Sequence, residues 1–180
     1  MKIEIRLAGP MHVAIVQDLI RPHPFAAERV GFAMCRMGTL ASKGKLILLN
    51  RYHSIPDEEY LDDPTVGARI GPEAITWAMQ AAYYGRPRRE GVFHVHLHSH
   101  RGRTRMSPVD SREIPKLIPG LQSVGRDAAH GILIVSLDHA SGWVWLPQVE
   151  EPVVARAVSV IGKKLGVFEW GPENEQCSFF

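Results

Sequence analysis

The sequence contains little cysteine: Cys35 and Cys177 are the only two among 180 residues. Their positions match no metal-binding or redox motif, and two cysteines do not make a disulfide-stabilised scaffold of a chain this long. No apolar stretch approaches the length of a membrane span, and the first residues alternate charged and apolar side chains, unlike a secretory signal. We therefore expect a soluble, cytoplasmic protein with no membrane partner.

Neither sign of charge is in large excess, because the sequence has 21 Lys and Arg residues and 19 Asp and Glu residues, which gives a net charge of +2. Nothing global then attracts the chain to nucleic acid, and no nucleic-acid partner is expected. Internal repeats and low-complexity tracts are absent as well. With 45% apolar residues, the chain can bury one core but is short for two. We expect one domain over residues 1–170 and a weakly ordered tail over 171–180.

Apolar periodicity predicts a series of strands separated by helices and irregular segments. Strands are expected over residues 3–7, 30–37, 45–52, from 91 onward, 132–137, 143–146 and 153–161. The second and third of these, and the fifth and sixth, are expected to pair as antiparallel hairpins. Because strands and helices do not alternate regularly, the order favours an α/β (α+β) domain with a mixed sheet sandwiched by helices over a doubly wound fold.

Three helices are predicted from periodicity and from their terminal residues. The first begins at Gly9-Pro10, the second covers Pro72–Tyr84, and the third follows Ser107. Proline at the first helical position and Gly85 just beyond the second helix are typical of helix ends. In the first helix, Val13, Val16, Leu19 and Ile20 are expected to face inward. Residues 54–69 carry two prolines and no period, which predicts a surface loop.

The most informative stretch has a histidine at every second position: His94, His96, His98 and His100. Side chains alternate across a strand, so the four imidazoles are expected on one face. Without a ligand they would be half-buried polar rings competing for partners, and protonation would make them repel one another. Two histidines at i and i+2 can instead reach one zinc ion, with Asp110 as third ligand and a position left for water. The alternatives are an exposed histidine row without function, or a row in which two of the four histidines are core residues whose polar atoms are satisfied.

The segment Ser107-Pro108-Val109-Asp110 has a structural explanation of its own. Serine at the N-cap, proline at N1 and aspartate at N3 start a helix well. A structural role does not exclude a functional one. A ligand carboxylate on the first helical turn is rigidly placed, and the serine hydroxyl beside it is able to face the site.

Together these stretches resemble the JAMM metalloprotease motif of MPN domains, in which a distant Glu precedes His-x-His, about seven residues, and Ser-x-x-Asp. The resemblance extends from residue 27 to residue 146 and implies a single MPN/JAMM-like domain. Glu28 stands at the head of a strand, where the family carries its catalytic glutamate. Glu58 and Glu59 are rivals, although they lie in the irregular loop. The resemblance also implies one zinc ion per chain.

The spacing departs from the family pattern and leaves two ligand pairs open. His98 and His100 are followed by six residues before Ser107, whereas His96 and His98 are followed by eight. His98 and Asp110 belong to both possibilities. His94 is expected to support the site or to pack beside it.

The family resemblance implies a hydrolase that cleaves the peptide or isopeptide bond after the C-terminus of a ubiquitin-like protein. Glu28 would act as general base and Ser107 would stabilise the oxyanion. The chain looks most similar to short, stand-alone bacterial members found beside ubiquitin-like, E1-like and E2-like partners, some of them in antiviral defence operons. Arg101, Arg103 and Arg105 are expected at the mouth of the site, where they would bind substrate.

Two other functional classes remain open at this point. A non-catalytic MPN-like module that binds a ubiquitin-like partner would be expected to lack the glutamate or the ligands, and this chain carries candidates for all of them. Another zinc hydrolase is also possible, because metal-activated water serves many reactions. A zinc deaminase is excluded, since the sequence has neither His-x-Glu nor Pro-Cys-x-x-Cys.

Overall fold

The computed structural model describes residues 1–24, 26–162, 166–169 and 178–179. Within these ranges the helices are α1 (Gly9–Leu19), α2 (Pro72–Gly85) and α3 (Pro108–Val124), with short 3-10 turns η1 (Asp57–Glu59) and η2 (Arg86–Arg88). The strands are β1 (Ile3–Ala8), β2 (Val30–Thr39), β3 (Lys45–Ser54), β4 (Glu90–Leu97), β5 (His130–Val135), β6 (Ala140–Trp145), β7 (Val153–Val154), β8 (Ala157–Ile161), β9 (Gly166–Glu169) and β10 (Ser178–Phe179). In the described part of the chain, no helix has the length and apolar character needed to cross a membrane.

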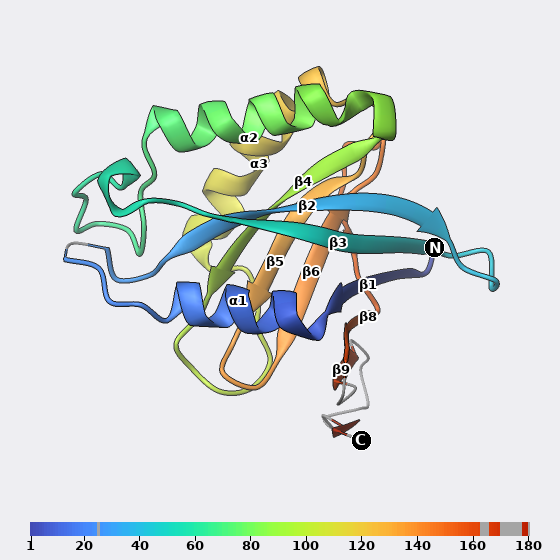
Figure 1. The fold of residues 1–180 in the computed structure, drawn as a ribbon, viewed down its shortest axis with the longest axis horizontal. Coiled ribbons are helices and arrows are strands. Elements are labelled where there is room, and N and C mark those ends of the chain that lie inside the picture. The colour runs from blue at the N-terminus through green and yellow to red at the C-terminus, as the bar shows by residue number, and fades with distance from the viewer. Residues whose placement is uncertain (25, 163–165, 170–177, 180) are drawn as a thin grey trace.

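The strands form one mixed sheet in the order β10-β9-β8-β1-β3-β2-β4-β5-β6-β7. Strand β1 runs parallel to both of its neighbours, and β4 runs parallel to β5. The sheet is strongly curled, because β6 and β8 are in contact although five strands separate them in the sheet order. A Cβ atom at Gly142 of β6 would overlap the Ile5 side chain of β1. Helices cover both faces of this sheet (Figure 1), which confirms the predicted α+β class and the mixed sheet between helices.

Helix α1 packs on one face of the sheet and fills the inside of the curl. Its buried residues are Ile15 and Leu19, which join the core formed by β1, β3 and the inner side of β4. The prediction that Val13 and Ile20 face inward is wrong, since they are 51% and 55% exposed. Apolar residues occur on several sides of this helix, so periodicity alone does not predict which side is buried. The packing of α1 inside the curled sheet determines the buried side.

Helices α2 and α3 cover the other face of the sheet. Ala74, Ala78 and Ala82 are fully buried, and these small side chains allow α2 to lie close to β4. The second core contains Phe32 of β2 and Ile132 of β5, packed beneath the two helices. Helix α2 begins at Pro72, as predicted, and ends one residue later than expected.

The C-terminal part of the sheet differs from the prediction. Residues 153–161 were expected to form one strand, and they form β7 on β6 and β8 on β1 instead. Between them, Ala155 N donates to Gly142 O and Arg156 N donates to Ile3 O. The chain can cross directly because the curl brings β6 and β1 together. The expected weakly ordered tail falls mainly on residues 171–177 and 180, which lie outside the described part.

Candidate metal centre

Strand β4 places the histidines between the sheet and α3. It lies between β2 and β5, so both of its edges are hydrogen-bonded. Phe93, Val95 and Leu97 point into the core that contains α1, and His94 and His96 lie on the opposite face. The regular strand ends at Leu97, yet His98 N still donates to Val135 O at 2.8 Å. The His98 ring therefore continues the row, with its centroid 4.9 Å from that of His96.

The beginning of α3 brings a carboxylate to these rings. Ser107 caps the helix: its Oγ accepts from Asp110 N at 3.1 Å, and Ser107 N donates to Asp110 Oδ2 at 2.8 Å. This capping box fixes the Asp110 side chain at the first turn. Asp110 Oδ1 lies 3.4 Å from His96 Nε2, and Asp110 Oδ2 lies 3.5 Å from His98 Nε2. The residues that start α3 thus place the Asp110 carboxylate beside two imidazoles that come from β4 and the residue after it.

Asp110 and His98 both have shifted pKa values. Burial opposes the charge on Asp110, but the facing imidazoles of His96 and His98 outweigh it and hold the Asp110 pKa well below its usual range. The Asp110 carboxylate raises the pKa of His98, against the smaller effect of burial. Asp110 is therefore an anion at neutral pH, facing two imidazole nitrogens in a largely buried position.

The two distances from Asp110 fit a shared metal ion better than direct hydrogen bonds, whereas the distance between the two imidazoles is compatible with a hydrogen bond. At 3.4 and 3.5 Å, the contacts of Asp110 with His96 and His98 exceed the usual 2.7–3.2 Å of N–H···O bonds. Ligand atoms about 2.0–2.2 Å from a tetrahedral zinc ion lie roughly 3.3–3.5 Å apart. The two Nε2 atoms are 3.0 Å apart, slightly closer than this spacing. Two imidazoles and a carboxylate are a donor set that zinc accepts, with a fourth position left for water.

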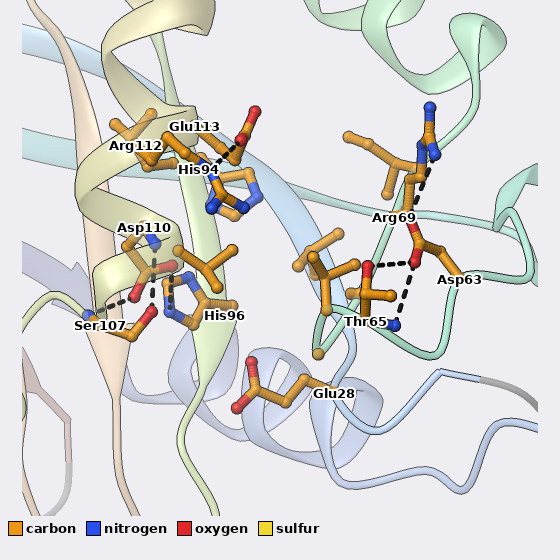
Figure 2. A pocket seen from close by; sticks show the side chains of 17 residues that line it. Glu28, Asp63, Thr65, Arg69, His94, His96, Ser107, Asp110, Arg112 and Glu113 are labelled. Atoms are coloured by element: carbon orange, nitrogen blue, oxygen red, sulfur yellow. Dashed lines mark hydrogen bonds and ion pairs between the residues drawn. The ribbon is translucent and has the colours of Figure 1, made fainter.

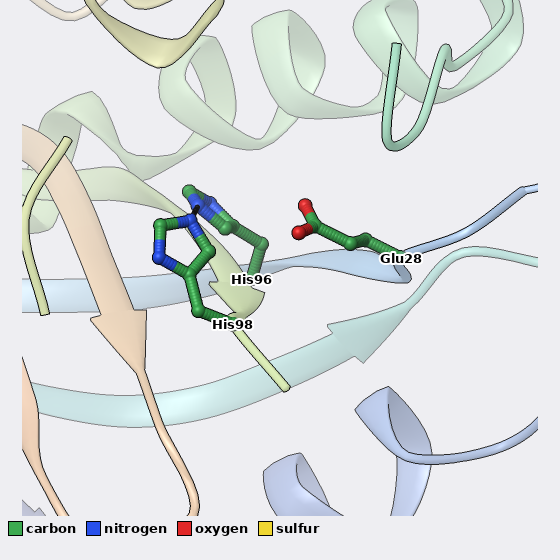
Figure 3. A group of neighbouring side chains, drawn as sticks. All are labelled: Glu28, His96 and His98. Atoms are coloured by element: carbon green, nitrogen blue, oxygen red, sulfur yellow. Dashed lines mark hydrogen bonds between the residues drawn. The ribbon is translucent and has the colours of Figure 1, made fainter. Parts of the chain in front are cut away.

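Glu28 faces this group from the segment before β2 (Figure 3). A carboxylate oxygen of Glu28 and a ring nitrogen each of His96 and His98 all lie within 4.8 Å of one another. Glu28 N donates to Gly67 O at 2.9 Å, which ties it to the loop after η1. Gly67 leaves room for the glutamate, because a Cβ there would lie 2.8 Å from Glu28 Oε2.

The residues that follow Glu28 are held from two sides. The Arg29 guanidinium is buried and donates to the carbonyls of Arg21 and Pro22, each at 2.8 Å. Its Nη1 also lies 2.7 Å from a carboxylate oxygen of Asp57. Tyr60 Oη donates to the carbonyl of Val30 and accepts from its N–H. Glu28 therefore projects from a fixed backbone, which a general base requires.

Glu28, His96, Ser107 and Asp110 line a pocket of about 470 Å³ (Figure 2). Its walls are the strand residues His94 and His96, the start of α3, and the loop from Asp63 to Ile70. Burial lowers the pKa of His94 to about 3, so this imidazole is neutral. Among the described residues, the Nδ1 atoms of His94 and His96 have no hydrogen-bond partner. The pocket thus contains the neutral His94 imidazole together with charged residues such as Arg69 and Glu113.

Some of the predicted site residues lie apart from this group. His100 is exposed, and its Nδ1 lies 2.9 Å from Arg101 O. Arg101, Arg103 and Arg105 are exposed in the loop between β4 and α3 and do not line the pocket. Glu58, in η1, does not line it either. The structure brings together Glu28, His96, His98, Ser107 and Asp110.

The pocket arginines were missed by the sequence reasoning. Arg69 lies in the loop opposite α3 and pairs with Asp63 at 3.1 Å, while Arg112 pairs with Glu113 at 2.7 Å. The spacing of Glu113, three residues after Asp110 and on the same helical face, could have predicted that Glu113 lies at the site. Nothing local indicates Arg69, because the loop reaches the pocket only through the tertiary fold.

Comparisons with known proteins add little. Neither a protein-family model nor a curated protein sequence matches the chain. Among solved structures, the N-terminal domain of STIL from Trichoplax adhaerens matches 91% of this chain and 44% of that chain, with 12% identity and a TM-score of 0.36. The chain thus spans less than half of that structure, and we draw no functional conclusion from so distant a likeness.

Proposed function

We propose that this chain is a zinc-dependent metallopeptidase of the JAMM (MPN-domain) kind. The observation that carries the proposal is the convergence of His96 Nε2, His98 Nε2 and the Asp110 carboxylate, at separations of 3.0 to 3.5 Å. Glu28 faces the two imidazoles from the segment before β2 (Figure 3). The donor set, the facing glutamate and the Ser107-x-x-Asp110 helix start all agree with the family motif.

The residues of the pocket suit a hydrolysis that uses an activated water. Bound zinc would supply Lewis acidity, lowering the pKa of water and polarising the scissile carbonyl. Glu28 would take a proton from the attacking water and return it to the leaving amine. The Ser107 hydroxyl accepts a bond from Asp110 N and keeps its own proton to donate to the developing oxyanion. No nucleophilic side chain is needed.

The proposed substrate is a ubiquitin-like protein joined through its C-terminus to a lysine or to a peptide extension. The family resemblance supports this class, together with E1-like and E2-like partners in the same pathway. An extended C-terminal tail would enter between α3 and the loop from Asp63 to Ile70, which form the two walls of the pocket. Arg101, Arg103 and Arg105, exposed outside the pocket, would contact the body of the substrate and affect KM more than kcat.

The test separates metal binding from catalysis. Metal-replete protein is expected to contain about one zinc per chain and to release a ubiquitin-like protein from a precursor, and a chelator should abolish the cleavage. Glu28→Gln should keep the zinc and the fold and lose nearly all cleavage, because a base is needed for turnover and not for metal retention. Glu58→Gln, on an exposed acid outside the pocket, is the matched control and should cleave normally.

Elemental analysis and cleavage rates can each contradict a different part of the proposal. A persistent absence of zinc or a comparable divalent ion would exclude the hydrolase. Full activity in Glu28→Gln would remove this residue from the mechanism. Zinc bound without cleavage of any ubiquitin-like conjugate would favour a non-catalytic module.

A further inference from the structure

A second cluster of charges lies at the beginning of β4, remote from the metal centre. The Glu90 carboxylate is almost fully buried and receives three guanidinium groups. Arg36 binds its Oε1 through Nε and Nη2 at 3.0 and 2.9 Å. Arg88 and Arg51 approach Oε2 at 3.1 and 3.4 Å. Six residues along a strand separate Glu90 from His96, about 20 Å.

The cluster carries more positive charge than Glu90 can balance. Each of the three arginine side chains is half exposed or more, at 50 to 62%. Among the described residues, Glu90 is the one carboxylate within 4 Å of any of them. The group therefore has a net charge of +2. A guanidinium has five N–H donors, and Arg51 and Arg88 each use one on Glu90, so most of their donors remain available.

Arg51 and Arg88 also line a pocket of about 370 Å³ between β3 and α2. Its other wall is aromatic: His53 is stacked on Trp77, with centroids 3.6 Å apart and planes within 5°. Tyr84, which is 69% exposed, also lines it. A volume of this size lies within the range of small-molecule sites. Guanidinium groups suit phosphate, and aromatic faces suit a planar ring.

We propose that this pocket binds an aromatic compound that carries a phosphate group. The phosphate would lie on Arg51 and Arg88, and the ring would lie against the wall that contains Trp77 and Tyr84. Arg36 would keep Glu90 paired through its two-bond contact, so ligand binding does not leave the buried carboxylate alone. The site is independent of the proposed hydrolysis.

Calorimetric titration of the zinc-loaded protein tests the proposal with four probes. Adenosine 5′-monophosphate and free phosphotyrosine represent two sources of a phosphorylated ring, and inorganic phosphate and adenosine are the controls. At least one phosphorylated ring is expected to bind about tenfold more tightly than either control, because only it contacts both walls. The tighter of the two identifies the source. If neither phosphorylated ring binds more tightly than both inorganic phosphate and adenosine, the proposal fails.

Variants locate the binding. Arg51→Ala and Arg88→Ala should each weaken it about tenfold, the usual loss for one charge-assisted contact. Arg126→Ala removes the same charge at an exposed position outside the pocket and should leave the affinity unchanged. Equal weakening by all three would mean nonspecific attraction and would overturn the proposal.

Gln80→Glu keeps the test valid if an arginine variant fails to fold. Gln80 is exposed on α2 and lines the pocket, so the change adds a negative charge without removing a buried contact. We expect tenfold weaker binding with an unchanged melting temperature, and unchanged binding would contradict the assignment. His98→Ala should bind the phosphorylated ring normally. A loss there would place the ligand at the metal centre instead.

Discussion

His96 and His100 differ in what surrounds them, although the sequence presents them as equivalent neighbours of His98. The His96 ring is 1% exposed and faces Asp110. His100 is exposed and turns its Nδ1 toward a backbone carbonyl. The regular strand ends at Leu97, and although the His100 ring centroid stays 5.7 Å from that of His98, His100 lies beyond the sheet in an exposed position.

The first prediction concerns the identity of the metal ligands. His96→Ala, His98→Ala and Asp110→Ala should each lower zinc affinity more than 100-fold, because each removes one of three protein ligands. His100→Ala should lower it less than about tenfold, below the 10–100-fold that supporting residues typically contribute. Competition with a chromophoric chelator measures the four affinities. Zinc loss in His100→Ala with retention in His96→Ala would assign the ligand pair to His98 and His100.

At the scale of elements, the loop between η1 and α2 shapes the site as much as the strand does. Leu61 N donates to Arg69 O, and Gly71 N donates to Glu59 O, so the ends of the loop are pinned together. In the middle of the loop, Gly67 O accepts a hydrogen bond from Glu28 N. The loop thus forms a wall of the pocket and fixes the direction of the glutamate.

The second prediction tests that contact. In Gly67→Ala, the new Cβ would lie 2.8 Å from Oε2 and 3.0 Å from Cδ of Glu28, closer than van der Waals contact. The flexible end of Glu28 can move aside, so the fold should keep its stability while kcat falls about tenfold or more from misplacement of the base. Zinc affinity should not change.

Steady-state kinetics and thermal melts measure the effect of Gly67→Ala, and Gly38→Ala is its control. A Cβ at Gly38 would meet its nearest neighbour, Leu46 Cβ, at 4.0 Å, so that variant should keep full activity. If Gly67→Ala is as active as the unchanged protein, the loop does not position Glu28.

At the scale of the whole molecule, His130 connects the end of α3 to the middle of the sheet. It is fully buried. Its Nδ1 accepts from Val92 N at 3.2 Å, and its Nε2 lies 3.1 Å from Gly125 O, which fixes the neutral tautomer with the proton on Nε2. Burial lowers its pKa, against the smaller effect of the bond to Gly125 O.

The third prediction follows from this lowered pKa. Below about pH 6.5, His130 becomes protonated in the unfolded chain but stays neutral in the folded chain. The contribution to stability is therefore present above pH 6.5 and is lost as the pH falls toward the lower folded pKa. Between pH 7 and pH 5, the protein should lose up to roughly 2 kcal/mol more unfolding free energy than His130→Gln, which cannot titrate.

Urea denaturation of both proteins at the two pH values gives this difference. The other titrating groups are common to both and cancel in the comparison. Identical pH dependence in the two proteins would show that His130 is not held neutral in the folded state.

The sequence by itself determined the features that depend on near neighbours along the chain. Proline at Pro72 and the Ser107 cap fixed the starts of α2 and α3, because orphan N–H groups at helix ends are satisfied locally. The i, i+2 histidines and the capping Asp110 indicated a candidate metal centre, because both signals come from near neighbours along the chain. The β2–β3 and β5–β6 pairs followed from apolar periodicity and short connections.

Only the tertiary structure decided what depends on distant contacts. The curl of the sheet selected the packed face of α1, and it divided residues 153–161 between β6 and β1. The fold placed Gly67 beside Glu28 and brought Arg36, Arg51 and Arg88 around one carboxylate. Periodicity and capping report interactions within about four residues. Side chains that meet across strands and loops leave no such signal, because their approach is set by how the whole chain packs.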